Sequence, residues 1–211
     1  GADGVIDVER EAELGKAIHS KGVMLLTGYL GNKYAQHFSL TLSANIAIEQ
    51  SYGYIDGDSA SLAELCALIS SITSLPISQS IALTGSINQH GDVQAIGGVN
   101  EKIEGFFKLC KMRGLTGEEG VIIPKSNQVN LVLDEEILNA VELGKFNIYA
   151  VETVDQALNL LMDLEAGDLV DGHYPENSVN GLALARLKDI ADIVNGDSED
   201  EKDAEPEEEK N

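Results

Sequence analysis

The chain has 211 residues, of which 43% are hydrophobic, so it is long enough and apolar enough for one domain with a sizeable core. Its formal net charge is −22 at neutral pH. Such a surface repels phosphate backbones, and we expect no nucleic acid among its partners. No apolar run is long enough to span a bilayer, and the first residues lack the basic and apolar segments of a secretion signal. We therefore expect a cytoplasmic protein with no membrane partner.

The N-terminal part of the chain carries only weak periodic patterns. Residues 4–13 resemble a short strand that runs into a polar segment, and the apolar residues of 21–33 are spaced as in a helix. Residues 37–53 are ambiguous. Alternating apolar residues near their start favour a strand, but the sequence SANIAIEQ that follows is equally compatible with a helix. Both readings stay open here.

The middle of the chain is better defined. Residues 61–72 have the i, i+3, i+4, i+7 spacing of an amphipathic helix, which Pro76 would stop. Residues 80–99 are typical of two strands around a turn at 89–91. Residues 101–114 predict a second helix with its apolar side chains on one face and a glycine past its end.

Strand and helix patterns continue to alternate toward the C-terminus. Residues 120–124 predict a buried strand and residues 134–144 a short helix. Residues 146–151 predict a further strand, and residues 153–162 a capped helix. Such alternation between residues 80 and 162 predicts an α/β domain. One more amphipathic helix is expected within residues 175–194, where Leu182, Leu184, Leu187, Ile190 and Ile193 would pack against the body or a neighbour.

These patterns predict how the chain divides. We expect a main domain at 1–164, a helical extension at 165–196 and a disordered acidic tail at 197–211, which holds nine acidic and two basic residues. The two cysteines, Cys66 and Cys110, fall within apolar helix patterns. With no sign of an oxidising compartment, we expect reduced thiols in the core.

The sequence YIDGDSASLAE at residues 54–64 places Ser59 at the start of a predicted helix. Serine at this position is most often an N-cap, whose hydroxyl accepts a hydrogen bond from the first turn. An exposed hydroxyl beside free backbone N–H groups is also a candidate nucleophile, because those groups would stabilise an oxyanion. Spacing alone does not choose between the two roles.

A nucleophilic serine needs a base, and Lys102 is the best candidate. It lies on the first turn of a predicted helix after Gly97 and Gly98, with Phe106 on the same face. Burial beside Phe106 and the positive end of the helix would both lower the pKa of its amine. Nothing in the sequence recommends any of the four histidines, which are His19, His37, His90 and His173. Taken alone, Lys102 is more typical of a solvated surface lysine.

Three motifs taken together resemble the proteolytic domain of the Lon protease family. They are GDSAS at 57–61, LTGSI at 83–87 and GGVNEK at 97–102, and the resemblance continues through VIIPKSN and NIYAVETVDQALNLLM to cover roughly residues 20–163. It implies the α/β fold of that domain, an α+β-type arrangement like ribosomal protein S5 domain 2. It also implies a Ser-Lys dyad of Ser59 and Lys102, with Thr84 supporting the lysine.

The chain departs from the common family pattern next to the serine. Asp58 and Ser61 stand where a proline and a glycine are usual, and Asp56 lies close by. These carboxylates would either hold the serine or the lysine by a hydrogen bond or block the site until the assembly is activated. The N-terminal segments are closer to the bacterial Lon-like subgroup than to the housekeeping enzyme.

The resemblance also implies partners that this chain does not contain. No G-x-x-x-x-G-K phosphate loop is present, so we expect no cofactor in this chain, and ATP and Mg would bind an AAA+ ATPase module elsewhere in a longer protein. A further strand is expected upstream. The family implies a homohexameric ring that hydrolyses peptide bonds of unfolded or damaged proteins.

Two other functions are alternatives to this one. The same fold serves as a catalytically silent assembly and DNA-binding module in recombination factors of the RadA type, which lack the Ser-Lys pair and tend to be basic. A nucleotide-binding domain that uses Gly97 and Gly98 is not supported, because the remaining glycines of such a motif are missing.

Overall fold

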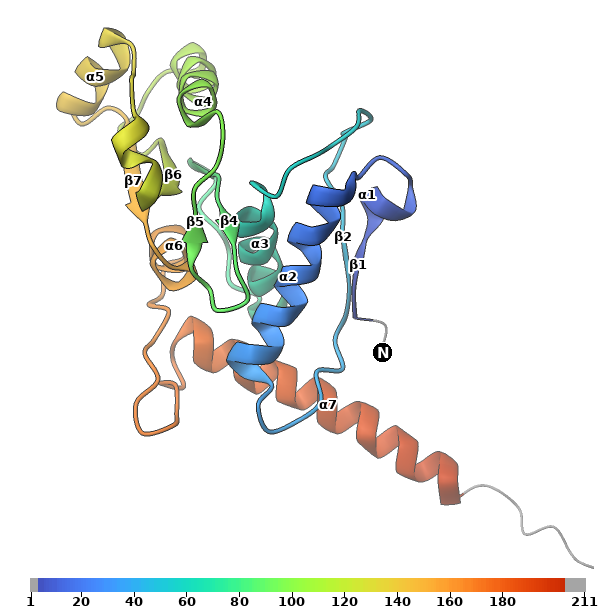
Figure 1. Ribbon diagram of the computed structural model, residues 1–211. Coiled ribbons are helices and arrows are strands. Elements are labelled where there is room, and N and C mark those ends of the chain that lie inside the picture. The colour runs from blue at the N-terminus through green and yellow to red at the C-terminus, as the bar shows by residue number, and fades with distance from the viewer. Residues whose placement is uncertain (1–3, 204–211) are drawn as a thin grey trace, which may run out of the picture.

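The structure, a computed structural model, describes the backbone of residues 4–203 and the side chains of residues 4–196 (Figure 1). Helices and strands alternate along most of this length. In chain order the elements are β1 (Gly4–Asp7), α1 (Val8–Glu11), α2 (Ala17–Tyr34), β2 (Ser43–Ile46), α3 (Ser61–Thr73), β3 (Ile81–Leu83), β4 (Ser86–Ile87), β5 (Val93–Gln94), α4 (Val99–Arg113), β6 (Gly120–Pro124), the 3-10 helix η1 (Lys125–Asn130), α5 (Glu135–Glu142), β7 (Asn147–Val151), α6 (Val154–Leu161) and α7 (Val179–Asp203).

Small parallel sheets organise these elements. The main sheet has the order β3-β6-β7 with all strands parallel, and β1 pairs in parallel with β2. A short antiparallel pair, β4-β5, encloses the predicted turn. Because each pair of neighbours in the main sheet is joined through a helix, the predicted α/β fold class is confirmed.

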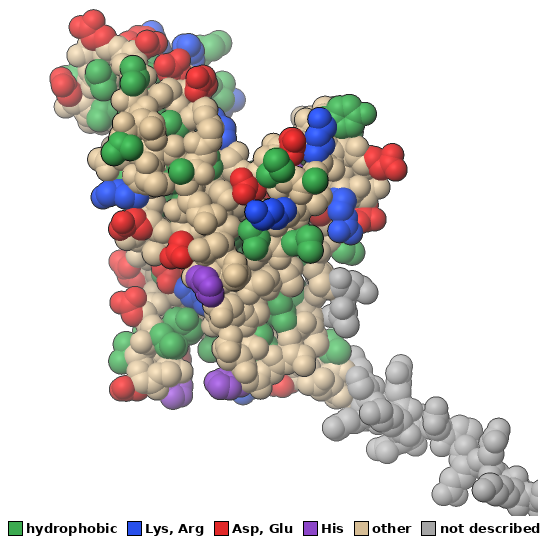
Figure 2. Space-filling model, in the orientation of Figure 1, with side chains coloured by type: hydrophobic (Ala, Val, Ile, Leu, Met, Phe, Trp, Pro, Cys, Tyr) green, Lys and Arg blue, Asp and Glu red, His purple; other side chains and the backbone are tan. Residues whose placement is uncertain are grey.

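Strand β6 separates two hydrophobic cores. Ile122 belongs to the larger core, formed mainly by α2, α3, α6 and α7, whereas Val121 and Ile123 belong to a smaller one beneath α4 and α5. Alternate side chains of a strand point to opposite faces, so every residue of GVIIP is buried. This explains why the strand is continuously apolar. Figure 2 shows a hollow between the lobe that carries α4 and α5 and the lobe that carries α1 and α2.

The structure resolves the ambiguous segments of the sequence. Within residues 37–53 only Ser43–Ile46 forms a strand, paired with β1, and the rest is irregular. The first of the two strands predicted within 80–99 is divided into β3 and β4, with Thr84 and Gly85 between them. Cys66 and Cys110 are buried and unpaired. Among the described residues, none of the helices combines the length and apolar character needed to cross a membrane.

The C-terminal helix packs against the body, which is one of the two partners that the sequence allowed for it. Val179, Ala183 and Leu187 are buried in the larger core. Ile193, predicted to pack, is 59% exposed, because it lies off the face that Ala183, Leu187 and Ala191 bury at four-residue spacing. The helix continues to Asp203, so residues 197–203 of the segment predicted to be disordered are helical. The remainder of that prediction, residues 204–211, lies outside the described residues.

The packing of α7 predicts the effect of shortening its side chains. Leu187→Ala should lower the free energy of unfolding by about 2–5 kcal/mol, because Leu187 is 2% exposed and the change leaves a cavity. Ile193→Ala on the same helix is the control and should change it by less than about 0.5 kcal/mol. Chemical denaturation of both variants measures the difference. Equal, small effects would show that α7 is an appendage and not part of the core.

Candidate active site

The hydroxyl of Ser59 is not used as a helix cap. Helix α3 begins at Ser61, its N-cap is Ala60 in a helical conformation, and no side chain caps its first turn. The Ser59 hydroxyl oxygen instead accepts a hydrogen bond of 2.8 Å from the Lys102 amine. Of the two roles that the sequence left open, the geometry therefore excludes the cap.

Lys102 reaches Ser59 from the first turn of α4. The N-cap of this helix is Gly98, whose φ of 69° lies in the left-handed region that glycine adopts without strain. The backbone N–H of Lys102 donates to the Gly98 carbonyl, which closes the first turn. The glycine pair in GGVNEK thus sets the direction in which α4 starts and carries Lys102 toward the serine.

Thr84 joins the two residues to the main sheet. Its side-chain oxygen accepts a bond of 3.2 Å from the Lys102 amine and donates one of 3.3 Å to the Ser59 carbonyl. Its backbone N–H donates to Ile122 of β6. Thr84 is 7% exposed. The structure thus brings three of the predicted site residues, Ser59, Thr84 and Lys102, into one hydrogen-bonded group.

A small pocket of about 260 Å³ opens beside this group. Apart from the three polar residues its walls are small or apolar, namely Ala60, Ala63, Ala82, Leu83 and Val121. Phe106, expected to bury the lysine, does not line this pocket and packs against Phe146, with ring centroids 6.4 Å apart. The apolar surroundings of Lys102 therefore come from α3 and the sheet, and not from its own helix.

Partial burial lowers the pKa of the Lys102 amine below its ordinary value. The residue as a whole is exposed, so the lowering originates at the end of the side chain, in the pocket. Within the described side chains, no carboxylate oxygen lies within 4 Å of this amine. No nearby anion therefore opposes the effect of burial.

The two aspartates do not join the group. Asp58 accepts a hydrogen bond of 2.8 Å from the Ser86 hydroxyl, and Asp56 accepts one from the backbone N–H of Gly57. The expectation that one of them holds or blocks Ser59 or Lys102 does not match this arrangement. The reason is that the Asp58 side chain reaches β4, where Ser86 is its partner. Nothing in the spacing of the sequence indicated the link between Asp58 and Ser86.

The histidines lie elsewhere. His37, His90 and His173 are exposed, and His19 is buried beside Asp7 and Glu64. None of them hydrogen-bonds to Ser59 in the described part of the chain. The geometry at this site is that of a hydroxyl paired with an amine.

Comparison with known proteins places the chain in a family. Residues 32–163 match the Lon protease (S16) C-terminal proteolytic domain. A Lon protease homolog of Escherichia coli K12 is 52% identical over 158 residues, which cover 75% of this chain and 27% of that protein. One of Haemophilus influenzae is 48% identical over 192 residues, which cover 89% of this chain and 31% of that protein. An archaeal Lon protease of Methanocaldococcus jannaschii is 39% identical over 120 residues, or 57% of this chain and 16% of that protein.

The chain therefore belongs to the Lon protease family, a family of serine proteases, and contains the proteolytic domain of that family. The resemblance inferred from the three motifs is confirmed. The chain spans less than a third of the length of the two bacterial relatives.

The role of Ser59 predicts a small effect of Ser59→Ala on stability. Because its hydroxyl does not cap α3, the free energy of unfolding should change by less than about 0.5 kcal/mol. Thr153→Ala is the matched control, since the Thr153 side chain caps α6 by accepting from the N–H of Gln156, and it should cost about 1 kcal/mol. Thermal or chemical denaturation compares the two. A larger loss for Ser59→Ala than for Thr153→Ala would contradict the geometry.

Proposed function

We propose that this chain is the proteolytic part of an ATP-dependent serine endopeptidase in which Ser59 is the nucleophile and Lys102 the general base. The observation that carries the proposal is the 2.8 Å contact between the lysine amine and the serine hydroxyl. Both polar partners of the amine, Ser59 and Thr84, are uncharged. An amine in this setting loses its proton more readily than a free lysine.

The contacts among Ser59, Lys102 and Thr84 support the following reaction. The neutral Lys102 amine accepts the Ser59 proton, and the serine oxygen forms a bond to the carbonyl carbon of the substrate. As the tetrahedral intermediate collapses, the C–N bond breaks and the protonated lysine returns the proton to the leaving amine. Water then releases the acyl group from the serine by the reverse proton transfers. Thr84, bound to the amine and to the Ser59 carbonyl, keeps both at the required distance.

Backbone N–H groups near the serine would stabilise the oxyanion. In the part of the chain that the structure describes, the N–H groups of Ser59 and Ala60 make no hydrogen bond. They lie at the start of α3, where the positive end of the helix also favours a negative charge. These two groups are therefore the candidates for the oxyanion hole.

The remaining parts of the proposal rest on the family. The matched part covers less than a third of the two bacterial relatives, which leaves room for an ATPase module with its ATP and Mg that would deliver unfolded or damaged proteins to this domain. A hexameric ring of such domains would enclose the serines in a chamber.

Activity should depend on Ser59 and on a neutral Lys102. A fluorophosphonate should label Ser59, and Ser59→Ala should abolish labelling and peptide hydrolysis. Lys102→Arg should be as inactive as Lys102→Ala, because arginine stays protonated. Since burial lowers the pKa of Lys102 and only the neutral amine accepts a proton, the rate in the parent should rise with pH through that lowered pKa.

Lys108, on the same helix and 4.0 Å from Glu104, is the control. Lys108→Ala should retain the activity and the pH profile of the parent. An active Lys102→Arg variant would remove Lys102 from the mechanism.

If copies of this chain form a ring, their association should depend on salt concentration. The surface charge of −22 opposes contact between copies at low ionic strength, and salt screens this repulsion. Sedimentation should therefore show larger species as protein and salt concentrations rise. Monomer alone under all these conditions would count against a ring contact within this domain.

A further inference from the structure

Four ionisable side chains are buried together near the turn that carries Ser59, which we call the Ser59 turn. Asp7 of β1, Glu9 of α1, His19 of α2 and Glu64 of α3 are between 2% and 7% exposed. Charged groups are rarely buried so completely unless each has a partner, because removal from water penalises the charged form. We call these four residues the buried ionisable cluster.

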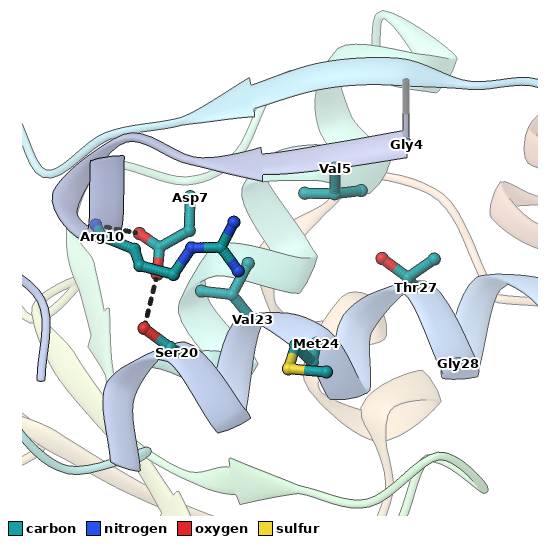
Figure 3. A pocket seen from close by; sticks show the side chains of 9 residues that line it. All are labelled: Gly4, Val5, Asp7, Arg10, Ser20, Val23, Met24, Thr27 and Gly28. Atoms are coloured by element: carbon teal, nitrogen blue, oxygen red, sulfur yellow. Dashed lines mark hydrogen bonds between the residues drawn. The ribbon is translucent and has the colours of Figure 1, made fainter. Parts of the chain in front are cut away.

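His19 lies between two of the carboxylates. Its Nε2 atom is 3.5 Å from Asp7 and 3.8 Å from Glu64. Asp7 also accepts hydrogen bonds from the Ser20 hydroxyl and the Arg10 backbone N–H, and it lines a pocket between β1 and α2 (Figure 3). Glu9 accepts a bond from the backbone N–H of Ile48.

One carboxylate oxygen of Glu64 lacks a hydrogen bond to the residues that the structure describes. Its Oε1 atom is buried and has no hydrogen-bond partner in the described part of the chain. Burial raises the pKa of Glu64, His19 opposes the shift, and the charges of Asp7 and Glu9 add to it. An ionised carboxylate here faces two like charges and a single imidazole. A protonated carboxyl has no such conflict and gains a donor.

Helix α2 connects the cluster to the Ser59 turn. Gly22, one turn after His19 on the same helix, lies so close to the turn that an added Cβ would be 3.2 Å from Cβ of Asp58. Glu64 lies in the first turn of α3, and its backbone N–H donates to the Ala60 carbonyl. One face of α2 therefore contacts both Glu64 and the residue before Ser59.

We propose that Glu64, with His19 and Asp7, is a positioning site that holds the Ser59 turn against α2, and that it holds best when Glu64 carries a proton. The proposal rests on the proposed function for its catalytic consequence, but its effect on stability does not.

The sign of the pH dependence follows from linkage. A carboxyl whose pKa is raised in the folded protein binds its proton more tightly than in the unfolded chain, so stability falls as pH rises from the ordinary glutamate range through the raised value. Of the other charged groups nearby, the Arg10 guanidinium pairs with exposed Glu11 and interacts less strongly with Asp7, and Asp58 is bound by Ser86. Glutamine has nearly the same shape as protonated glutamate and cannot ionise.

The test compares Glu64→Gln and Glu64→Ala with the parent chain and with Glu142→Gln, which neutralises an exposed carboxylate on α5. Unfolding temperature is measured from about pH 5 to about pH 8. The parent and Glu142→Gln should lose stability as pH rises, and Glu64→Gln should lose clearly less. Parallel curves for Glu64→Gln and the parent would overturn the proposal, even if the chain showed no protease activity.

The catalytic readout separates positioning from bulk stability. Peptide hydrolysis is measured below the unfolding temperature, with active sites counted by fluorophosphonate. Glu64→Ala should lower kcat by roughly tenfold to a hundredfold with little change in KM, because a displaced nucleophile slows the chemical step. Glu64→Gln should restore most of kcat. An unchanged kcat in Glu64→Ala, in an active parent, would overturn the positioning role. If Glu64→Ala does not fold, the comparison of Glu64→Gln with the parent decides.

Discussion

The carbonyl oxygen of Ser59 is the acceptor on which the candidate site depends. It receives a hydrogen bond from the Gly85 N–H at 2.9 Å and one from the Thr84 side chain, while the Gly85 carbonyl accepts from the N–H of Leu62. This reciprocal link ties the start of α3 to the end of β3. The Thr84 N–H continues it into β6. The turn that carries Ser59 is therefore attached to the main sheet, and the buried strand β6 gives it the rigidity that a loop would lack.

The candidate site lacks the acidic residues that are abundant in the rest of the molecule. The chain has 36 acidic residues, yet the walls of the pocket beside Lys102 contain none. Asp58, adjacent to the nucleophile, is directed to Ser86 and away from the amine. A carboxylate in contact with the amine would raise its pKa and keep it protonated. The partner that Ser86 provides for Asp58 is thus a condition for the proposed chemistry, although neither residue contacts the reacting atoms.

Helix α3 combines an apolar face with one polar contact in its first turn. Its apolar face, with Leu62, Leu65 and Ile69, packs in the larger core, to which α7 also contributes. In the first turn, Glu64 also faces His19 of α2 at 3.8 Å, and this contact is polar. The proposed pH dependence therefore belongs to the end of α3 that follows Ser59 and not to its apolar face. The proposed positioning by Glu64 would thus act at the end of α3 that is next to Ser59.

The sequence by itself determined the strongly periodic elements and the catalytic candidates. The stripe of α3, the continuous apolar run of β6 and the three motifs around Ser59, Thr84 and Lys102 are local signals, and they were sufficient for the α/β class and for the family. Tertiary structure alone decided which partner each polar group took. That Asp58 binds Ser86, that α7 buries Leu187 and leaves Ile193 exposed, and that Glu64 meets His19 all depend on segments distant in the chain. Spacing carries no information about such contacts, because they follow from how helices pack on one another and not from the period of any one helix.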